Sequence, residues 1–227
     1  PGSGAYLGMD VELGNDTNGN PYLNSGGKAN DGTQFAELNA EKAGTLYQDV
    51  LTVPGATLNW SLAHAGRDGT DTMALLIAPV DVAQDITDAL KNKTTRAAIQ
   101  EALNGSITVN GVNVPIRNYI VDGNISDGCT AWGVHNGTYT VPAGQYVSRF
   151  FFVAVASASG DSEEGLKRGN LIDRVWFSTD PVPPAAGSGI LRVTKTLLKT
   201  DGTALTDAEL IQAKENLHFT VVNSDRQ

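Results

Sequence analysis

The segment between residues 34 and 67 contains three short runs of the kind that form β-strands, separated by turn residues. The runs cover residues 35–38, 46–50 and 57–64, and the Pro54-Gly55 pair supplies a turn before the last of them. Strands this short cannot bury an apolar face alone, so they must pack into a larger sheet structure. The segment therefore constrains the chain to a β-rich fold.

The run over residues 57–64 alternates between apolar and polar side chains. Leu58, Trp60 and Leu62 fall on one face, while Asn59 and Ser61 fall on the other. We expect the first set in the core. His64 continues the apolar face, and we expect it where that face approaches the rim of the fold.

Further strand-like runs follow, and they are interrupted once by a helical pattern. Within 81–104, apolar residues recur at helical spacing, and Thr94 or Thr95 is an N-cap candidate for a second short helix. The strongest run, 146–156, is apolar on both faces and is therefore expected at the centre of a sheet. The other strand-like runs are 73–78, 106–109, 112–119, 138–141 and 169–178.

Several of these segments together resemble the galactose-binding-like, lectin-type β-sandwich of secreted and surface proteins. The resemblance is carried by Gln34–Asn39, Gly44–Gln48, Val53–Gly55, Leu58–Arg67, Val141–Gln145 and Gly169–Asp173, and it covers roughly residues 10–178. It implies an all-β, jelly-roll or galactose-binding-like β-sandwich over residues 5–179, with a short helical insertion at 81–104.

Residues 180–189 have the Pro- and Gly-rich composition of a linker. Residues 190–227 resemble the start of a Cna-B-like, immunoglobulin-type repeat of Gram-positive surface proteins, so we expect a piece of a longer chain. In such repeats a lysine of the first strand can form an isopeptide bond. Lys195 stands at that kind of position, and its partner strand is absent from this sequence.

Charge and cysteine content exclude several classes of function. The net charge is −9, and 16 Lys and Arg residues are spread thinly, so nucleic acid is not expected as a partner. Cys129 is the single cysteine, so there is no internal disulfide. No apolar run approaches the roughly 20 residues that cross a bilayer, and membrane insertion is not expected.

The sequence offers no recognisable catalytic set. The five carboxylates considered for a glycosidase pair show no spacing that singles out two of them: Glu37, Asp49, Asp68, Asp71 and Asp173. The three histidines are scattered, and no serine-hydrolase elbow or phosphate-binding loop occurs. We therefore expect a protein that is not an enzyme.

The resemblance implies one possible cofactor, a structural calcium ion where early and late strands adjoin. Glu37 and Asp173 would be its ligands. In the alternative interpretation both are buried carboxylates, satisfied by backbone N–H groups or by Arg67.

Recognition of another molecule is the remaining class. A sugar site combines an aromatic platform with polar side chains that bond hydroxyl groups. Trp132 supplies such a ring, although it is equally consistent with a loop anchor folded back on the core. The predicted ligand-binding residues are His64, Arg67, Asp71, Trp132, His135 and Tyr139.

These features predict a non-catalytic binding module of an extracellular, cell-wall-attached or secreted adhesin that recognises host glycans or glycoproteins. Two alternatives stay open. One is a surface that binds a host protein such as an immunoglobulin, through the helical insertion and the sheet edges. The other is a structural stalk domain.

Overall fold

The computed structural model describes residues 3–6, 12–15, 28–179 and 206. The chain divides into two compact units, residues 1–186 and 187–227. Almost all of the second unit lies outside the described residues, as do the predicted linker, the Cna-B-like segment and Lys195. The described strands and helices all belong to the first unit.

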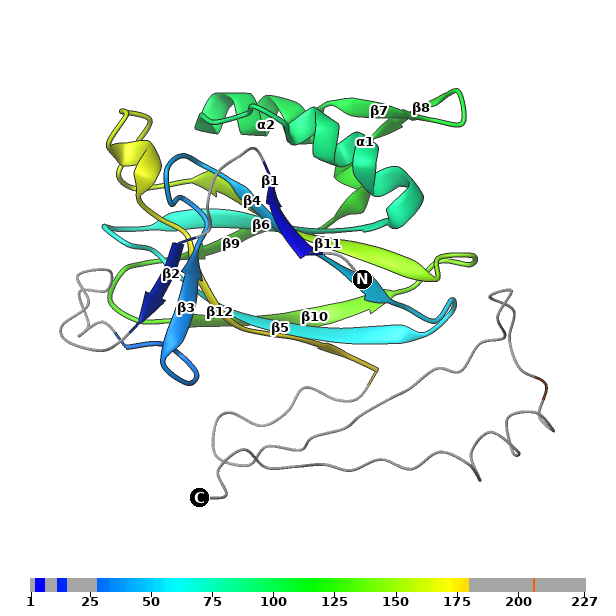
Figure 1. Cartoon of the computed structure of the whole chain (residues 1–227), viewed down its shortest axis with the longest axis horizontal. Helices are drawn as coiled ribbons and strands as arrows, with labels where there is room; N and C mark the ends of the chain where they lie inside the picture. The colour runs from blue at the N-terminus through cyan, green and yellow to red at the C-terminus, as the bar shows by residue number, and fades with distance from the viewer. Residues whose placement is uncertain (1–2, 7–11, 16–27, 180–205, 207–227) are drawn as a thin grey trace, which may run out of the picture. The chain divides into compact units, whose positions relative to one another are not determined.

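The first unit is a β-sandwich of two five-stranded antiparallel sheets (Figure 1). Sheet A has the order β1 (Ser3–Tyr6), β4 (Thr45–Leu51), β11 (Val147–Ala156), β6 (Asp71–Pro79) and β9 (Ile120–Asp127). Sheet B has the order β10 (Gly133–Thr140), β5 (Thr57–Ala65), β12 (Leu171–Ser178), β3 (Gln34–Glu37) and β2 (Glu12–Asn15). The all-β sandwich predicted from the sequence is confirmed.

A helical insertion lies on the side of sheet A that faces away from sheet B (Figure 1). It consists of α1 (Val80–Leu90), α2 (Arg96–Asn104), the hairpin of β7 (Ser106–Val109) and β8 (Val112–Pro115), and the 3-10 turn η1 (Ile116–Tyr119). A second 3-10 turn, η2 (Gly165–Lys167), precedes β12. Thr95 is the N-cap of α2, since its hydroxyl accepts a hydrogen bond from the backbone N–H of Ala98.

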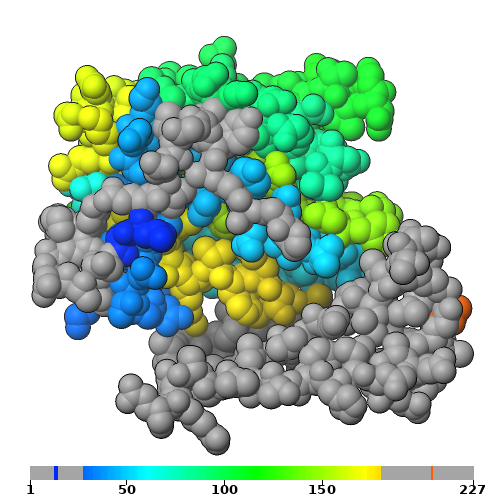
Figure 2. Space-filling view, viewed as in Figure 1, coloured from blue at the N-terminus to red at the C-terminus, as the bar shows by residue number. Residues whose placement is uncertain are grey.

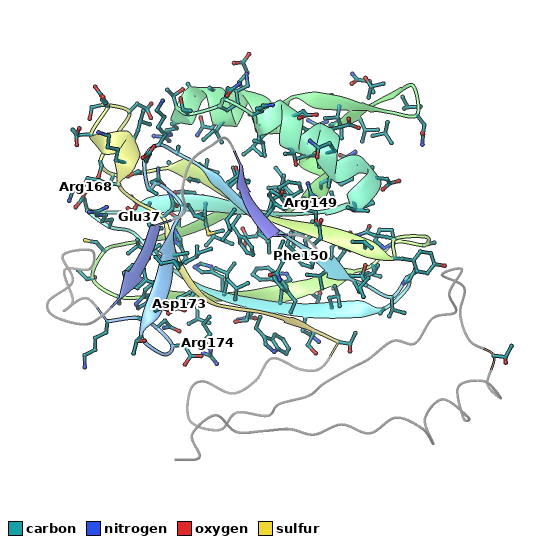
Figure 3. All side chains as sticks on the ribbon, viewed as in Figure 1. Glu37, Arg149, Phe150, Arg168, Asp173 and Arg174 are labelled. Carbon is teal, nitrogen blue, oxygen red and sulfur yellow. The ribbon has the colours of Figure 1, made fainter. Side chains whose placement is uncertain are left out.

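Strand β11 has apolar side chains on both faces, so it contacts sheet B on one side and the helical insertion on the other. It occupies the middle of sheet A, as its two-sided apolar pattern predicts. Phe150 points between the sheets, where its ring lies 4.0 Å from that of Phe177, whereas Phe151, 1% exposed, lies on the opposite face. Figure 3 shows Arg149 on that second face, toward the helices. There Arg149 pairs with Asp49 and reaches the Thr87 hydroxyl of α1. The insertion therefore covers an apolar sheet face that would otherwise meet water.

The core of sheet B has the alternation that the sequence predicts. Leu58, Trp60 and Leu62 of β5 are buried in the main core. Trp60 packs directly on the backbone of β10, because a Cβ atom at Gly137 would lie 2.8 Å from its Cζ2 atom. Glycine at position 137 is therefore required by this close approach.

Several strands differ from the sequence-based expectation. β1, β2 and β9 were not predicted as strands, and the run predicted over 112–119 is a strand only in β8 and continues as the 3-10 turn η1. β10 begins at Gly133 and not at Thr138, so residues 133–137, outside the predicted run, also belong to a strand that pairs with β5. The reason is that β10 is an edge strand with alternating half-buried and exposed residues and few apolar ones, which gives a weak sequence signal.

In Figure 2 the insertion, in green, lies along the upper edge of the described part of the molecule. Within the described residues, no helix is long and apolar enough to cross a membrane.

Candidate functional site

Four of the six predicted ligand-binding residues gather at one end of the sandwich. This polar end is formed by the ends of β5 and β9 and the starts of β6, β10 and β12. It contains His64, Arg67, Asp71 and His135. Tyr139 lies at the opposite end of β10, opposite Leu58 in register, so the six residues do not form one site.

Asp127 joins the two sheets through two histidines. Its Oδ2 atom lies 2.8 Å from Nδ1 of His64 and 2.7 Å from Nε2 of His135. Asp127 belongs to sheet A, and both histidines belong to sheet B. Partial burial alone would raise the pKa of Asp127, but the hydrogen bonds and positive charge from His64 and His135 outweigh it, so the pKa is lowered.

The other nitrogen of His64 also faces an acceptor. The Asn170 side chain donates from Nδ2 to the Ala156 carbonyl and to Asn39, which turns its Oδ1 atom toward Nε2 of His64, 3.1 Å away. Each of the two ring nitrogens of His64 therefore has a hydrogen-bond partner inside the fold. His64 has 0% of its surface exposed and is therefore a structural link between layers.

Asp71 serves as a cap for three chain segments. Its oxygens accept hydrogen bonds from the backbone N–H groups of Arg67 (2.9 Å), Ala158 (2.7 Å) and Asn170 (2.9 Å). Asp71 is also 0% exposed. Gly169 fits beside it with φ of +135°, and a Cβ there would lie 2.6 Å from Asp71 Oδ2. The carboxylate holds the turns together and has no surface for a ligand.

These positions correct the sequence-based picture of a shallow rim site. His64 and Asp71 were expected to contact a ligand, yet both are enclosed by protein partners. His135 and Arg67 are partly exposed, and each is paired with a carboxylate, Asp127 and Glu37 respectively. The sequence showed that these side chains are polar but not that their hydrogen bonds are already made within the fold.

The two carboxylates predicted as calcium ligands also have protein partners. Glu37 accepts from Arg67 Nη1 at 2.9 Å and from the Gly169 N–H at 2.8 Å. Asp173 accepts from the N–H groups of Asn30 (2.7 Å) and Asp31 (2.9 Å). This arrangement matches the alternative interpretation made from the sequence.

In the part of the chain that the structure describes, no group of three or more His, Cys, Asp or Glu residues is placed to hold a metal ion. The calcium ion stays a prediction.

Trp132 is placed as a loop anchor, one of the two roles that the sequence allows. Its ring packs edge-on against Phe35 at 5.8 Å, and its Nε1–H donates to the Lys28 carbonyl at 2.9 Å. With Ala65 and Leu171 these residues form a small apolar cluster apart from the main core. Because Ala65 and Leu171 are register partners next to the inward pair His64 and Ile172, this cluster lies on the outer face of sheet B.

Tyr139 is likewise tied into the sandwich, since its hydroxyl donates to Gln145 Oε1 at 3.1 Å. Burial, together with Tyr119, raises the pKa of Tyr139, although the hydrogen bond to Gln145 lowers it. Its ring packs against the main core.

The outer face of sheet B carries a group of side chains that sequence reasoning did not assemble. Ser61 of β5 stands in register between Asn136 of β10 and Trp176 of β12. The next row places Asn59 between Thr138 and Ser178. Register partners share a face, and Trp60 and Phe177 occupy the core side, so these six residues project outward. We call them the outer strip: Asn59, Ser61, Asn136, Thr138, Trp176 and Ser178.

The outer strip is partly accessible to solvent. Asn136 and Thr138 are exposed, and Trp176, Asn59 and Ser178 are half-buried, while Ser61 at the centre is only 5% exposed. With strands about 4.8 Å apart, the rows are about 10 Å wide. One indole ring is thus placed among amide and hydroxyl groups on a rigid sheet. The sequence indicated that Asn59 and Ser61 face away from the core, but nothing local indicated that Trp176 joins them.

Comparison with known proteins gives structural similarity only. No family model matches the sequence, and no curated protein matches it. The fold is similar to a xylan-binding domain of carbohydrate-binding family 22 from Paenibacillus barcinonensis, with TM-score 0.43, 11% identity, and coverage of 78% of this chain and 84% of that one.

The fold is also similar to a family 16 carbohydrate-binding module, with TM-score 0.39, 13% identity, and coverage of 75% of this chain and 86% of that one. A family 35 carbohydrate-binding module from Clostridium thermocellum gives TM-score 0.37, 12% identity, and coverage of 78% of this chain and 98% of that one. These similarities concern the fold alone.

Proposed function

We propose that this β-sandwich is a non-catalytic glycan-binding module of an extracellular adhesin, secreted or attached to a bacterial cell wall, which recognises host glycans or glycoproteins through the outer strip. One observation carries the proposal: Trp176 lies in register beside Ser61 and Asn136 on the outer face of a rigid sheet. An indole face can stack on the C–H face of a sugar ring. The neighbouring amide and hydroxyl groups can donate to and accept from its hydroxyls.

The chemistry of the outer strip favours binding rather than reaction. Its side chains are an indole, two amides and three hydroxyls, without a carboxylate pair or a histidine. The histidines and carboxylates of the polar end already have protein partners, so they serve the fold. The strip also sits on strands, which hold binding groups more rigidly than loops do.

The test is glycan-array binding of the purified chain with two aromatic truncations compared. Trp176→Ala removes the ring of the outer strip. Tyr146→Ala removes a ring of similar size that is 68% exposed and immediately precedes β11. Burying an aromatic face contributes about 1.5–3 kcal/mol, so Trp176→Ala should weaken binding about tenfold or more, while Tyr146→Ala leaves it unchanged. Retention of Trp176→Ala at the wild-type level would contradict the proposal, as would an array without any binding.

A second candidate, binding of a host protein such as an immunoglobulin, is favoured by a separate observation. Leu51, Val53 and Tyr146 are 65%, 58% and 68% exposed. They lie near one another, since Leu51 pairs with Val147 and the Thr52 N–H donates to the Tyr146 carbonyl at 2.8 Å. Exposed aliphatic side chains around a tyrosine are typical of protein interfaces.

Pull-down from serum separates the two candidates with the same variants. Protein binding predicts that Tyr146→Ala loses the partner, that Trp176→Ala keeps it, and that removing the partner's glycans has no effect. Glycan binding predicts the reverse in all three measurements. A stalk domain predicts no binding in either assay.

A further inference from the structure

Strand β12 contains one residue more than the strand it pairs with. Asp173 is opposite Ala63 of β5, and the next pair is Trp176 opposite Ser61. Three steps along β12 therefore match two steps along β5. The extra residue falls at Arg174 and Val175, and Arg174 has a φ of +47°. Such an insertion is a β-bulge, a feature that redirects side chains at functional sites.

The bulge reverses which side chains of β12 face the core. Ile172, before it, is 3% exposed in the main core. Phe177, after it, also faces the core, where its ring lies 4.0 Å from Phe150. The two are an odd number of residues apart, and in an uninterrupted strand such residues point to opposite faces. If the same residues of β12 alternated regularly, without a bulge, Phe177 would point outward and Trp176 would point toward the core.

The backbone at the bulge is unfavourable for the residue that occupies it. A positive φ is readily adopted by glycine, and to a lesser degree by asparagine, but it is strained for arginine. Strain of this kind persists where the surrounding structure holds it, and it concentrates at functional sites. Figure 3 labels Asp173 and Arg174 on the side of sheet B that faces away from sheet A.

We propose that the Arg174 bulge is the positioning element of the binding face, because it absorbs the extra residue of β12 and so holds Trp176 outward in the row of Ser61 and Asn136. The inference rests on the proposed glycan-binding function and refines its ligand class. All members of the outer strip are uncharged, and the chain carries a net charge of −9. The strip therefore fits a neutral sugar and disfavours an acidic one.

The first test changes the strand parity and reads the position of Trp176 without any glycan. A variant lacking both Arg174 and Val175 places Trp176 directly after Asp173, opposite Leu62 and therefore on the core side. A variant lacking Val175 alone is the control, because regular pairing then keeps Trp176 opposite Ser61. Oxidation of each tryptophan by N-bromosuccinimide, located by peptide mass spectrometry, then reports its accessibility. We expect Trp176 to be oxidised at least about tenfold more slowly in the variant lacking both residues than in the wild type, with Trp60 protected in both. A folded double-deletion variant whose Trp176 is oxidised at the wild-type rate would overturn the inference.

A second pair of variants decides the question if the deletion prevents folding. Arg174→Gly accepts the positive φ, so we expect a higher Tm than the wild type with unchanged oxidation of Trp176. Arg174→Val places a β-branched residue there, so we expect a lower Tm and a severalfold change in Trp176 oxidation. Equal Tm and equal oxidation in the two variants would refute the positioning role.

The ligand class is read on an array that carries neutral, sialylated and uronic-acid oligosaccharides. We expect retention on neutral members, unchanged by Arg174→Gly and lost in the variant lacking both Arg174 and Val175. Retention on acidic members alone would overturn the ligand class. If no glycan is retained while the oxidation results hold, the proposed function fails and the structural role of the bulge stands.

Discussion

Replacement of Asp71 tests most directly whether the polar end serves the fold or a ligand. The structure assigns Asp71 a structural role, since it accepts three backbone hydrogen bonds and is 0% exposed. Replacing Asp71 should therefore change the free energy of unfolding. A residue that only contacts a ligand would change binding and leave stability nearly unaltered.

The expected size follows from the three bonds. Each buried donor left without a partner costs about 1–3 kcal/mol, and hydrogen bonds to a charged group lie toward the upper part of that range. The contributions are not additive, because water can enter the space that is vacated. We expect Asp71→Ala to cost about 3–5 kcal/mol, a large part of the roughly 5–15 kcal/mol typical of a domain.

Asp71→Asn should cause a smaller loss of stability than Asp71→Ala. Its single carbonyl oxygen can replace Oδ2, which serves Arg67 and Asn170, but the amide NH₂ then faces the N–H of Ala158. We expect a cost of about 1–3 kcal/mol. Asp85→Asn on the exposed face of α1 is the matched control and should stay within about 0.5 kcal/mol of the wild type.

The assay is equilibrium unfolding in urea, followed by tryptophan fluorescence, with the slope of the transition checked for constancy. A loss below about 1 kcal/mol for Asp71→Ala would refute the reasoning. So would equal losses for Asp71→Asn and Asp85→Asn.

Two further predictions concern Asp127 and Gly137. The folded-state pKa of Asp127 is lowered below its unfolded value of about 3.9, so its stabilising contribution is present above that pH and is lost as the pH falls through the folded value. The urea midpoint should therefore drop on acidification below about pH 4, and less steeply in Asp127→Asn; parallel pH profiles would contradict this. Gly137→Ala should cost about 1–3 kcal/mol, because its Cβ would lie 2.8 Å from the Trp60 ring. Thermal unfolding measures this against Gly128→Ala, where nothing lies within 4 Å of the added Cβ, and equal Tm values would count against the close packing.

Patterns with a short period were predictable from the sequence. The core face of β5, the central position of β11 and the helical insertion all follow from alternation or helical spacing within one segment. Strand β9 and the first half of β10 were missed, because their apolar residues are too few or too irregular to produce such a pattern.

The binding residues were predictable only in part. His64, Asp71 and Trp132 were predicted as ligand-binding residues, but His64 and Asp71 are buried and all three are hydrogen-bonded within the fold. Their partners lie far along the chain: His64 bonds to Asp127 and to Asn170, 63 and 106 residues away. No local pattern contains contacts of that separation.

Side-chain alternation is a local property of each strand, so the amino-acid sequence alone establishes that this chain forms paired β-sheets with one helical insertion. Tertiary strand pairing, in contrast, decides whether the Trp176 ring lies on the outer face or the core face of sheet B. Trp176 points outward only because β12 pairs with β5 across the bulge at Arg174. A single added residue would reverse every later side chain of a regular strand. The bulge that absorbs it is placed by pairing with a strand more than 100 residues away in the sequence.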